Sequence, residues 1–200
     1  MRKKRGIFVL LLLTVLLTVS ACGDKTPKVY IRRAQLSEKE SDVAELLRGD
    51  QKAYFFDFVA ANGAKSAEIR TYELKDGKWK PVSGGTTFAM SIPTGRIALE
   101  FDKIPDGTRI SFADNNLFLH QDNAKLAADT AEMSNAVSQL KGPAAADCEK
   151  EIPLVIQSFS ASGKTEAPTV ESFRHPEKYG DKNGDLIYSV TVTFHEKALS

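Results

Sequence analysis

Reactive side chains are scarce in this chain of 200 residues, which has two cysteines, one tryptophan and three histidines. His195-Glu196 begins the zinc-protease pattern His-Glu-x-x-His, but Leu199 stands where the second histidine belongs. A Gly-x-Ser-x-Gly elbow is absent. The glycines of Ser83-Gly84-Gly85-Thr86 lack the spacing and the lysine of a phosphate loop. The sequence therefore predicts no catalytic residue and no cofactor.

A metal site has only weak support. Asp181, Asn183 and Asp185 match the opening of a calcium loop, but Leu186 replaces the required glycine and Val192 the closing glutamate. The alternative is a turn at Asn183-Gly184 that leads into the final strand. We favour the turn and predict no metal.

Long apolar runs are also missing, with one exception at residues 7–19. Arg2, Lys3, Lys4 and Arg5 precede this run, as in a secretory signal peptide. The stretch 7–21 would be about 22 Å long as a helix. A bilayer core needs about 30 Å, so a membrane-spanning helix is the weaker alternative.

The run ends in Val19-Ser20-Ala21-Cys22, which resembles the lipobox of bacterial lipoprotein precursors. The resemblance implies cleavage after Ala21 and a thioether from Cys22 to diacylglycerol. It places the protein on the extracytoplasmic face of a bacterial membrane, lipid-anchored. Two acyl chains, such as palmitate, anchor a protein stably where one binds marginally. A chance cysteine after an ordinary cleavage site is the alternative.

Removal of the signal changes the composition. The chain has 27 basic and 26 acidic residues, and residues 1–21 contribute four basic and no acidic ones, so the mature chain is near −3. No basic cluster is interleaved with aromatics, so we predict no nucleic-acid partner. With Cys22 lipidated, Cys148 cannot form an intramolecular disulfide. Its acidic neighbours favour an inert thiol.

The predicted organisation is a signal peptide at 1–21, a lipidated tether at 22–28 and a single β-rich extracytoplasmic domain at 29–200. A helix is expected over 38–48. Ser37 and Glu40 have the spacing of a capping box, and Val43, Leu46 and Leu47 share a helical face.

Short apolar runs punctuated by Gly, Pro and Asp predict strands. The segments are 29–31, 53–60, 67–74, 78–82, 86–92, 96–101, 108–113, 151–159 and 186–194. Tyr72 and Leu74 are out of step with Ala67 and Ile69, which indicates a slip of register in 67–74. The last strand is expected to complete a sheet begun near Phe55. The predicted fold is mainly β, an antiparallel β-sandwich-like domain with one or two short helices.

Residues 120–150 have two interpretations. Leu126, Met133, Val137 and Leu140 could share a helical face that Gly142-Pro143 ends. The abundance of Ala, Ser, Asp and Asn is equally compatible with an irregular insert.

The aromatic-rich strand at 53–60 and three short motifs loosely resemble small, uncharacterised surface lipoproteins. The motifs are the hairpin with Leu74, Gly77, Lys78 and Trp79, the start Glu151-Ile152-Pro153-Leu154, and the final Val190-Thr191-Val192-Thr193-Phe194. That group has no assigned activity, so the resemblance implies architecture and location only.

The functional hypothesis is a membrane-anchored binding or structural module of the cell envelope, with an envelope protein or glycan as ligand. Trp79 and Tyr72 are the candidate ligand contacts, although a lone tryptophan also commonly closes the edge of a β core. The competing hypothesis is an extracytoplasmic hydrolase whose polar residues converge only in space. The sequence names no specific activity.

Overall fold

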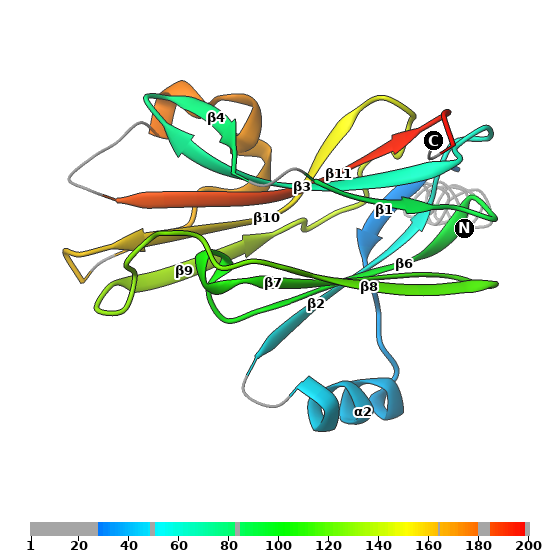
Figure 1. Cartoon of the computed structure of the whole chain (residues 1–200), viewed down its shortest axis with the longest axis horizontal. Helices are drawn as coiled ribbons and strands as arrows, with labels where there is room; N and C mark the ends of the chain where they lie inside the picture. Colours follow the sequence, from blue (N-terminus) through cyan, green and yellow to red (C-terminus); the bar gives the residue numbers. More distant parts are fainter. Residues whose placement is uncertain (1–27, 49–50, 83–84, 164, 180–184, 199–200) are drawn as a thin grey trace, which may run out of the picture.

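Two antiparallel β-sheets lie face to face and enclose the core (Figure 1). The computed structural model describes residues 28–48, 51–82, 85–163, 165–179 and 185–198. The predicted signal peptide, Cys22 and the tether up to residue 27 lie outside the described residues, as do residues 181–184 of the predicted turn. The predicted mainly β, sandwich-like fold is confirmed.

Sheet A has five strands in the order β1-β2-β6-β7-β8. Their bounds are β1 Tyr30–Arg33, β2 Lys52–Val59, β6 Thr94–Phe101, β7 Thr108–Asp114 and β8 Leu117–Asn123. The edge strand β1 is bridged on its outer side at Ile31, which exchanges two backbone hydrogen bonds of 2.9 Å with Ala144.

Sheet B has the order β4-β3-β11-β10-β9, with β5 as a sixth strand beside β3. The bounds are β3 Ser66–Lys75, β4 Lys78–Pro81, β5 Thr86–Ala89, β9 Ser134–Gln139, β10 Glu151–Ser160 and β11 Leu186–His195. The helical elements are α2 Glu38–Arg48 and the 3-10 turns η2 Ile104–Asp106, η3 Val170–Arg174 and η4 Pro176–Tyr179.

Aromatic rings from both sheets join in the core. Phe58 of β2 stacks on Phe112 of β7, with ring centroids 5.5 Å apart, and Phe88 of β5 lies 5.2 Å from the other side of Phe112. Phe194 of β11 meets Phe58 at 5.1 Å, across the space between the sheets. All four side chains are almost fully buried, so they supply much of the hydrophobic stabilisation.

The prediction that the last strand completes the sheet of Phe55 is wrong. The strand β11 pairs with β3 and β10 in sheet B, whereas Phe55 belongs to β2 in sheet A. Alternation reveals that one face of a strand is buried, but it carries no information on which strand lies beside it. Here β11 and β2 bury their faces against each other rather than pairing edge to edge.

The predicted helix within 120–150 is also wrong. This region contains the end of β8 and the whole of β9, and the irregular alternative fits the loops at 124–133 and 140–150. Val137 lies in β9, which pairs with β10 from Ser134↔Ser160 to Gln139↔Val155. Tertiary pairing overrides the weak local preference of this Ala- and Ser-rich stretch.

The two sheets differ in what covers their outer faces. The turns η3 and η4 lie on sheet B, seen in orange at the top of Figure 1, while α2 hangs below sheet A. Each outer face is thus covered only in part, sheet B by η3 and η4 and sheet A by α2.

Candidate functional site

The predicted ligand contacts Trp79 and Tyr72 pack against Phe173 of η3. The Trp79 ring stacks on Phe173 at 4.9 Å and its Nε1 donates a hydrogen bond to the Phe173 carbonyl oxygen at 2.9 Å. Tyr72 meets the same ring edge-on at 5.9 Å and is 9% exposed. This packing favours the alternative in which Trp79 closes the edge of the β core.

The same contacts explain the irregular spacing in β3. Tyr72 and Leu74 lie on the outer face of sheet B, whereas Ile69 points into the core. The pairing of β3 with β11 runs from Ser66↔His195 to Glu73↔Tyr188 without a shift, so the predicted slip of register is wrong. Both faces of β3 are buried. The apolar residues at the start of the strand lie on its inner face and those at its end lie on its outer face, which gives the irregular spacing.

A different site is built by α2, which begins at the predicted capping box. The Ser37 N–H and hydroxyl both donate to Glu40 Oε2 at 2.8 Å, and the Glu40 N–H donates to Ser37 Oγ at 3.3 Å. These bonds satisfy N-terminal groups that the helix itself leaves unpaired. The helix therefore has a fixed starting point beside sheet A.

Arg96 of β6 ties α2 to the sheet. Its Nε donates to Asp57 Oδ1 at 2.6 Å, and its Nη1 donates to Glu40 Oε1 at 3.2 Å. Hydrogen bonds from the Ser37 backbone, the Ser37 hydroxyl and Arg96 lower the pKa of Glu40 to about 2. Glu40 thus remains ionised and bound to Arg96 over a wide pH range.

The outer face of sheet A has small side chains at its centre. The register places Ala98 of β6 between Phe55 of β2 and Ser111 of β7, and Ser111 opposite His120 of β8. Ala113 lies two residues beyond Ser111 on the same face. Small residues between larger ones leave a depression in the sheet surface.

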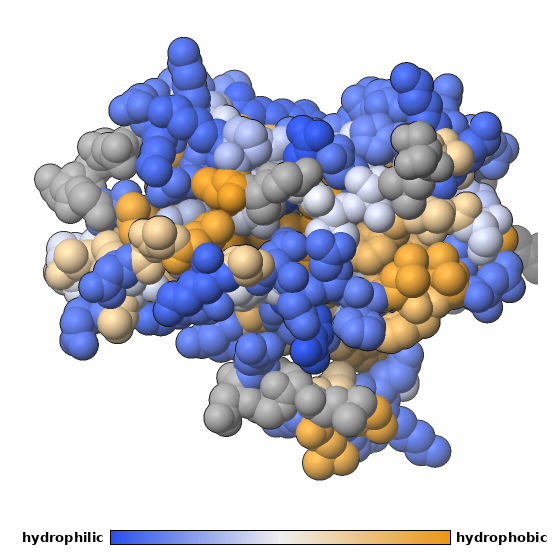
Figure 2. All heavy atoms as spheres, viewed as in Figure 1, coloured by the Kyte–Doolittle hydropathy of each residue, from blue (hydrophilic) through white to orange (hydrophobic). Residues whose placement is uncertain are grey.

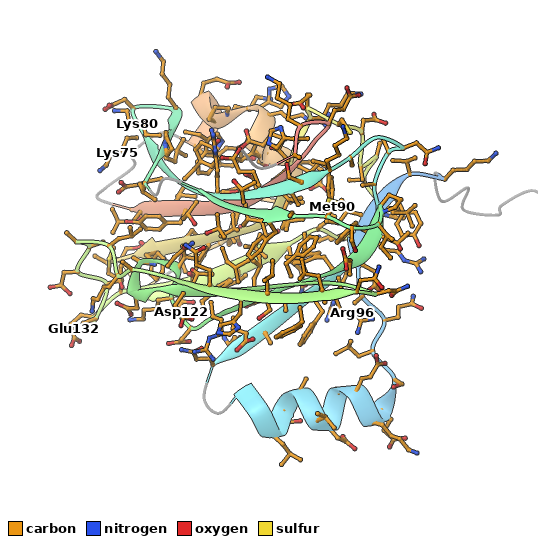
Figure 3. All side chains as sticks on the ribbon, turned by 45° about the vertical axis from the view of Figure 1, so that its right-hand side comes forward. Lys75, Lys80, Met90, Arg96, Asp122 and Glu132 are labelled. Carbon is orange, nitrogen blue, oxygen red and sulfur yellow. The ribbon has the colours of Figure 1, made fainter. Side chains whose placement is uncertain are left out.

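The helix α2 stands over this depression and does not fill it. A groove of about 790 Å³ remains between helix and sheet, with Val43 and Ala44 from α2 and Phe55 and Phe118 from the sheet among its lining. Figure 3 shows Arg96 and Asp122 on the side of sheet A that α2 faces. We call this space the α2 groove.

Exposed apolar side chains gather around the α2 groove. Among the described residues, the exposed large hydrophobic side chains are Val43 at 54%, Phe118 at 69% and Leu46 at 83%. Val43 and Phe118 line the groove, and Leu46 follows Val43 by three positions on α2. Figure 2 shows apolar surface at the lower end of the molecule, where α2 lies. Clustered exposed apolar groups are typical of interaction sites.

Charged side chains border the groove. Arg109 Nε donates to Asp122 Oδ1 at 2.8 Å, and this bond lowers the pKa of Asp122. Glu100 faces the groove opposite Arg109 in the register, and its charge adds to the hydrogen bond and charge of Asp122 in raising the pKa of Arg109. Lys39 of α2 also lines the groove. The groove thus offers apolar surface together with charges of both signs.

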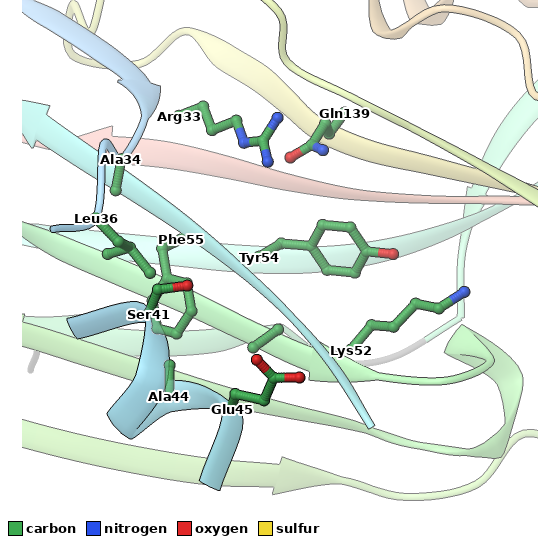
Figure 4. A pocket seen from close by; sticks show the side chains of 11 residues that line it. Arg33, Ala34, Leu36, Ser41, Ala44, Glu45, Lys52, Tyr54, Phe55 and Gln139 are labelled. Atoms are coloured by element: carbon green, nitrogen blue, oxygen red, sulfur yellow. The ribbon is translucent and has the colours of Figure 1, made fainter. Parts of the chain in front are cut away.

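A second, more polar hollow lies on the other flank of α2. It has a volume of about 470 Å³ and extends from Glu45 to Tyr54 of β2 and Gln139 of β9. Figure 4 shows Arg33 and Gln139 pointing toward one another above the Tyr54 ring. Burial, and then the charge of Asp102, raises the pKa of Tyr54, so its hydroxyl stays protonated. This hollow can offer hydrogen bonds but little apolar surface.

The other polar residues give the hydrolase hypothesis no support. His195 lies between two carboxylates, with Nδ1 2.7 Å from Glu149 Oε2 and Nε2 3.3 Å from Glu68 Oε2, rather than beside a serine hydroxyl. No group of three or more His, Cys, Asp or Glu side chains within the described ranges is placed to hold a metal ion. Burial, followed by nearby carboxylates, raises the pKa of Cys148, which keeps the thiol in its unreactive form.

Comparison with known proteins adds no assignment. No family model, curated protein or solved structure matches this chain. Across the described residues, no helix has the length and apolar character needed to cross a membrane.

Proposed function

We propose that this chain is a lipid-anchored extracytoplasmic lipoprotein whose β-sandwich is a binding module, with the α2 groove as its ligand site. The observation that carries the proposal is the clustering of exposed Val43, Leu46 and Phe118 around a groove with a floor of small residues. Burying these side chains against a ligand would be favourable at roughly 25 cal/mol per Å² of apolar surface.

The anchor half of the proposal rests on Val19-Ser20-Ala21-Cys22. Replacing Cys22 by alanine is expected to move the protein from the membrane fraction to the soluble fraction or to the unprocessed precursor. The reason is that the Cys22 thiol is the attachment point for both acyl chains. Fractionation with metabolic labelling by a radioactive fatty acid measures this. Cys148→Ala is the matched control and should remain labelled. Labelling that survives Cys22→Ala would contradict the anchor.

The binding half is tested by cross-linking in cells that express the full-length, anchored chain. A photoreactive benzoyl-phenylalanine at position 118 should give a discrete adduct, because this side chain lines the groove. The same group at the exposed position of Glu132, which Figure 3 labels far from α2, is the control. Ser111→Trp, which fills the groove floor, should abolish the adduct at position 118. Absence of an adduct at 118, or the same adduct at 132, would overturn the proposal.

A further inference from the structure

We infer that the hollow of about 470 Å³ on the other flank of α2, which Figure 4 shows, binds an anionic saccharide, meaning a sugar or polyol unit that carries a carboxylate or a phosphate. We call this space the polar hollow. It differs from the α2 groove in offering polar rather than apolar contacts. Three features point to such a ligand: the side chains that both sheets direct into the hollow, their lack of partners among the described residues, and the balance of charge around them.

Sheet A lines the polar hollow with side chains from its inner face. Lys52, Tyr54 and Phe56 lie on one face of β2, and Phe56 is part of the core between the sheets. Arg33 of β1 is paired directly with Phe56, so it lies on that same face. The inner face of the sheet therefore changes along β2 from an apolar residue at Phe56 to a phenol at Tyr54 and an ammonium group at Lys52.

Sheet B contributes an amide from the opposite side. Gln139 follows Val137 by two positions in β9, and Val137 packs against the core, so Gln139 also lies on an inner face. Inner faces of a β-sandwich normally carry the apolar side chains of the core. Polar side chains that depart from this pattern are expected where a protein has a functional site.

The polar side chains of the hollow remain available to a ligand. No side-chain hydrogen bond or ion pair joins any described residue to Arg33, Lys52, Tyr54 or Gln139. The Tyr54 ring stacks on Phe101, with ring centroids 4.9 Å apart, which holds its hydroxyl in place. Since this hydroxyl stays protonated, it can both donate and accept a hydrogen bond.

The charge of the hollow favours an anion. Its charged lining residues are Arg33, Lys52 and Glu45, and Glu45 already has an interaction of its own. Asp102, whose charge reaches Tyr54, does not line the hollow. The Arg33 guanidinium can bind a carboxylate or a phosphate through two parallel hydrogen bonds, and the Lys52 ammonium adds a second positive charge.

The neutral groups and the size of the hollow suit a hydroxylated ligand. The Gln139 amide and the Tyr54 hydroxyl can exchange hydrogen bonds with sugar hydroxyls. The volume of about 470 Å³ falls within the range of about 300–1,000 Å³ that is typical of small-molecule pockets. A neighbouring hollow of about 660 Å³ shares Arg33 and Gln139 and adds Lys141, Glu166 and further hydroxyl groups. A saccharide of more than one unit can therefore continue from one hollow into the other.

The test is isothermal titration calorimetry of the full-length protein in detergent at low salt, with three probes. Digalacturonate carries carboxylates, a dimer of glycerol phosphate carries phosphates, and the dimethyl ester of digalacturonate has sugar hydroxyls without the charge. At least one charged probe should bind saturably, and the neutral ester should bind about tenfold more weakly or not at all. The charged probe that binds identifies carboxylate or phosphate as the anion. Failure of both charged probes, or equal binding of the ester, would overturn the inference.

Two variants examine the assigned cations. Arg33→Gln and Lys52→Gln should each weaken the charged probe about fivefold or more, because each removes a positive charge that faces the anion. Lys78→Gln removes the same charge from β4, at the opposite edge of sheet B from β9, and should leave the affinity within roughly twofold. Melting temperatures equal to that of the parent separate lost binding from lost folding. Affinity unchanged in both hollow variants, or reduced equally in Lys78→Gln, would contradict the assignment.

This site and the proposed function can fail separately. The cross-link at position 118 reports on the α2 groove, whereas the saccharide probes report on Arg33 and Lys52. Saccharide binding without the cross-link would support the polar hollow and contradict the groove proposal. The cross-link without saccharide binding would support the groove and contradict the polar hollow.

Discussion

Replacing Gln157 by leucine is expected to lower the free energy of unfolding by about 2–5 kcal/mol, because the change leaves buried backbone groups without partners. Gln157 is 0% exposed. Its Oε1 accepts the Ile104 N–H at 2.7 Å, and its Nε2 donates to the Asp102 carbonyl oxygen at 2.9 Å and to Asn135 Oδ1 at 3.2 Å. Leucine has a similar volume but can make none of these bonds.

The position of Gln157 explains why the expected effect is large. It belongs to β10 in sheet B, while Asp102 and Ile104 lie between β6 and β7 of sheet A. One amide therefore connects the two sheets through polar contacts inside an apolar core. Such a group is stabilising while all its bonds are made and strongly destabilising when they are lost.

Chemical denaturation followed by tryptophan fluorescence measures the effect. Gln51→Leu is the matched control, since Gln51 is exposed, and its free energy of unfolding should change by no more than about 0.5 kcal/mol. A Gln157→Leu protein as stable as the control would show that the core tolerates the unpaired groups.

The second large effect is expected for Gly95→Ala in β6. A Cβ at this position would clash with the Ala113 carbonyl oxygen and would lie 2.8 Å from Phe58 Cζ, which is closer than Cβ atoms approach other atoms in folded proteins. The Phe58 ring is held in the core between Phe112 and Phe194 and has little room to move. Overpacking of this kind destabilises by about 1–3 kcal/mol and sometimes more.

Gly142→Ala is the matched control, because no atom lies within 4 Å of the Cβ that would be added there. Its melting temperature should stay close to that of the parent or rise slightly, as a more restricted unfolded chain favours folding. The Gly95→Ala protein should melt several degrees lower. Equal melting temperatures for the two variants would contradict the close approach of β6 and β7.

Local signals in the sequence predicted local structure well. The capping box at Ser37 and Glu40 and the helix over 38–48 are confirmed, because both depend on neighbouring residues only. The sheet that contains β11 was predicted incorrectly, since pairing partners are separated by more than a hundred residues for β3 and β11. The strand β9 was missed because its pairing with β10, not its composition, determines its conformation.

The α2 groove could not be derived from the sequence alone. Ala98 and Ser111 are unremarkable until β6 and β7 pair and bring them together as a floor. One signal was available in the sequence. Val43 and Leu46 form an apolar stripe on a short, mostly charged helix, and Phe118 stands between Leu117 and Leu119, so that in a strand it points to the opposite face from both. Whether these side chains are exposed depends on how far α2 lies from the sheet, and the local sequence does not determine that separation.

The bridge between β1 and Ala144 has a mechanical consequence. Chain tension applied ahead of residue 28 reaches Ile31, which is held by β2 on one side and by Ala144 on the other. The segment after Ala144 leads into β10, so the load divides between the two sheets instead of peeling one strand from an edge. A force along the leading segment is therefore shared between the pairing of β1 with β2 and the two bonds to Ala144.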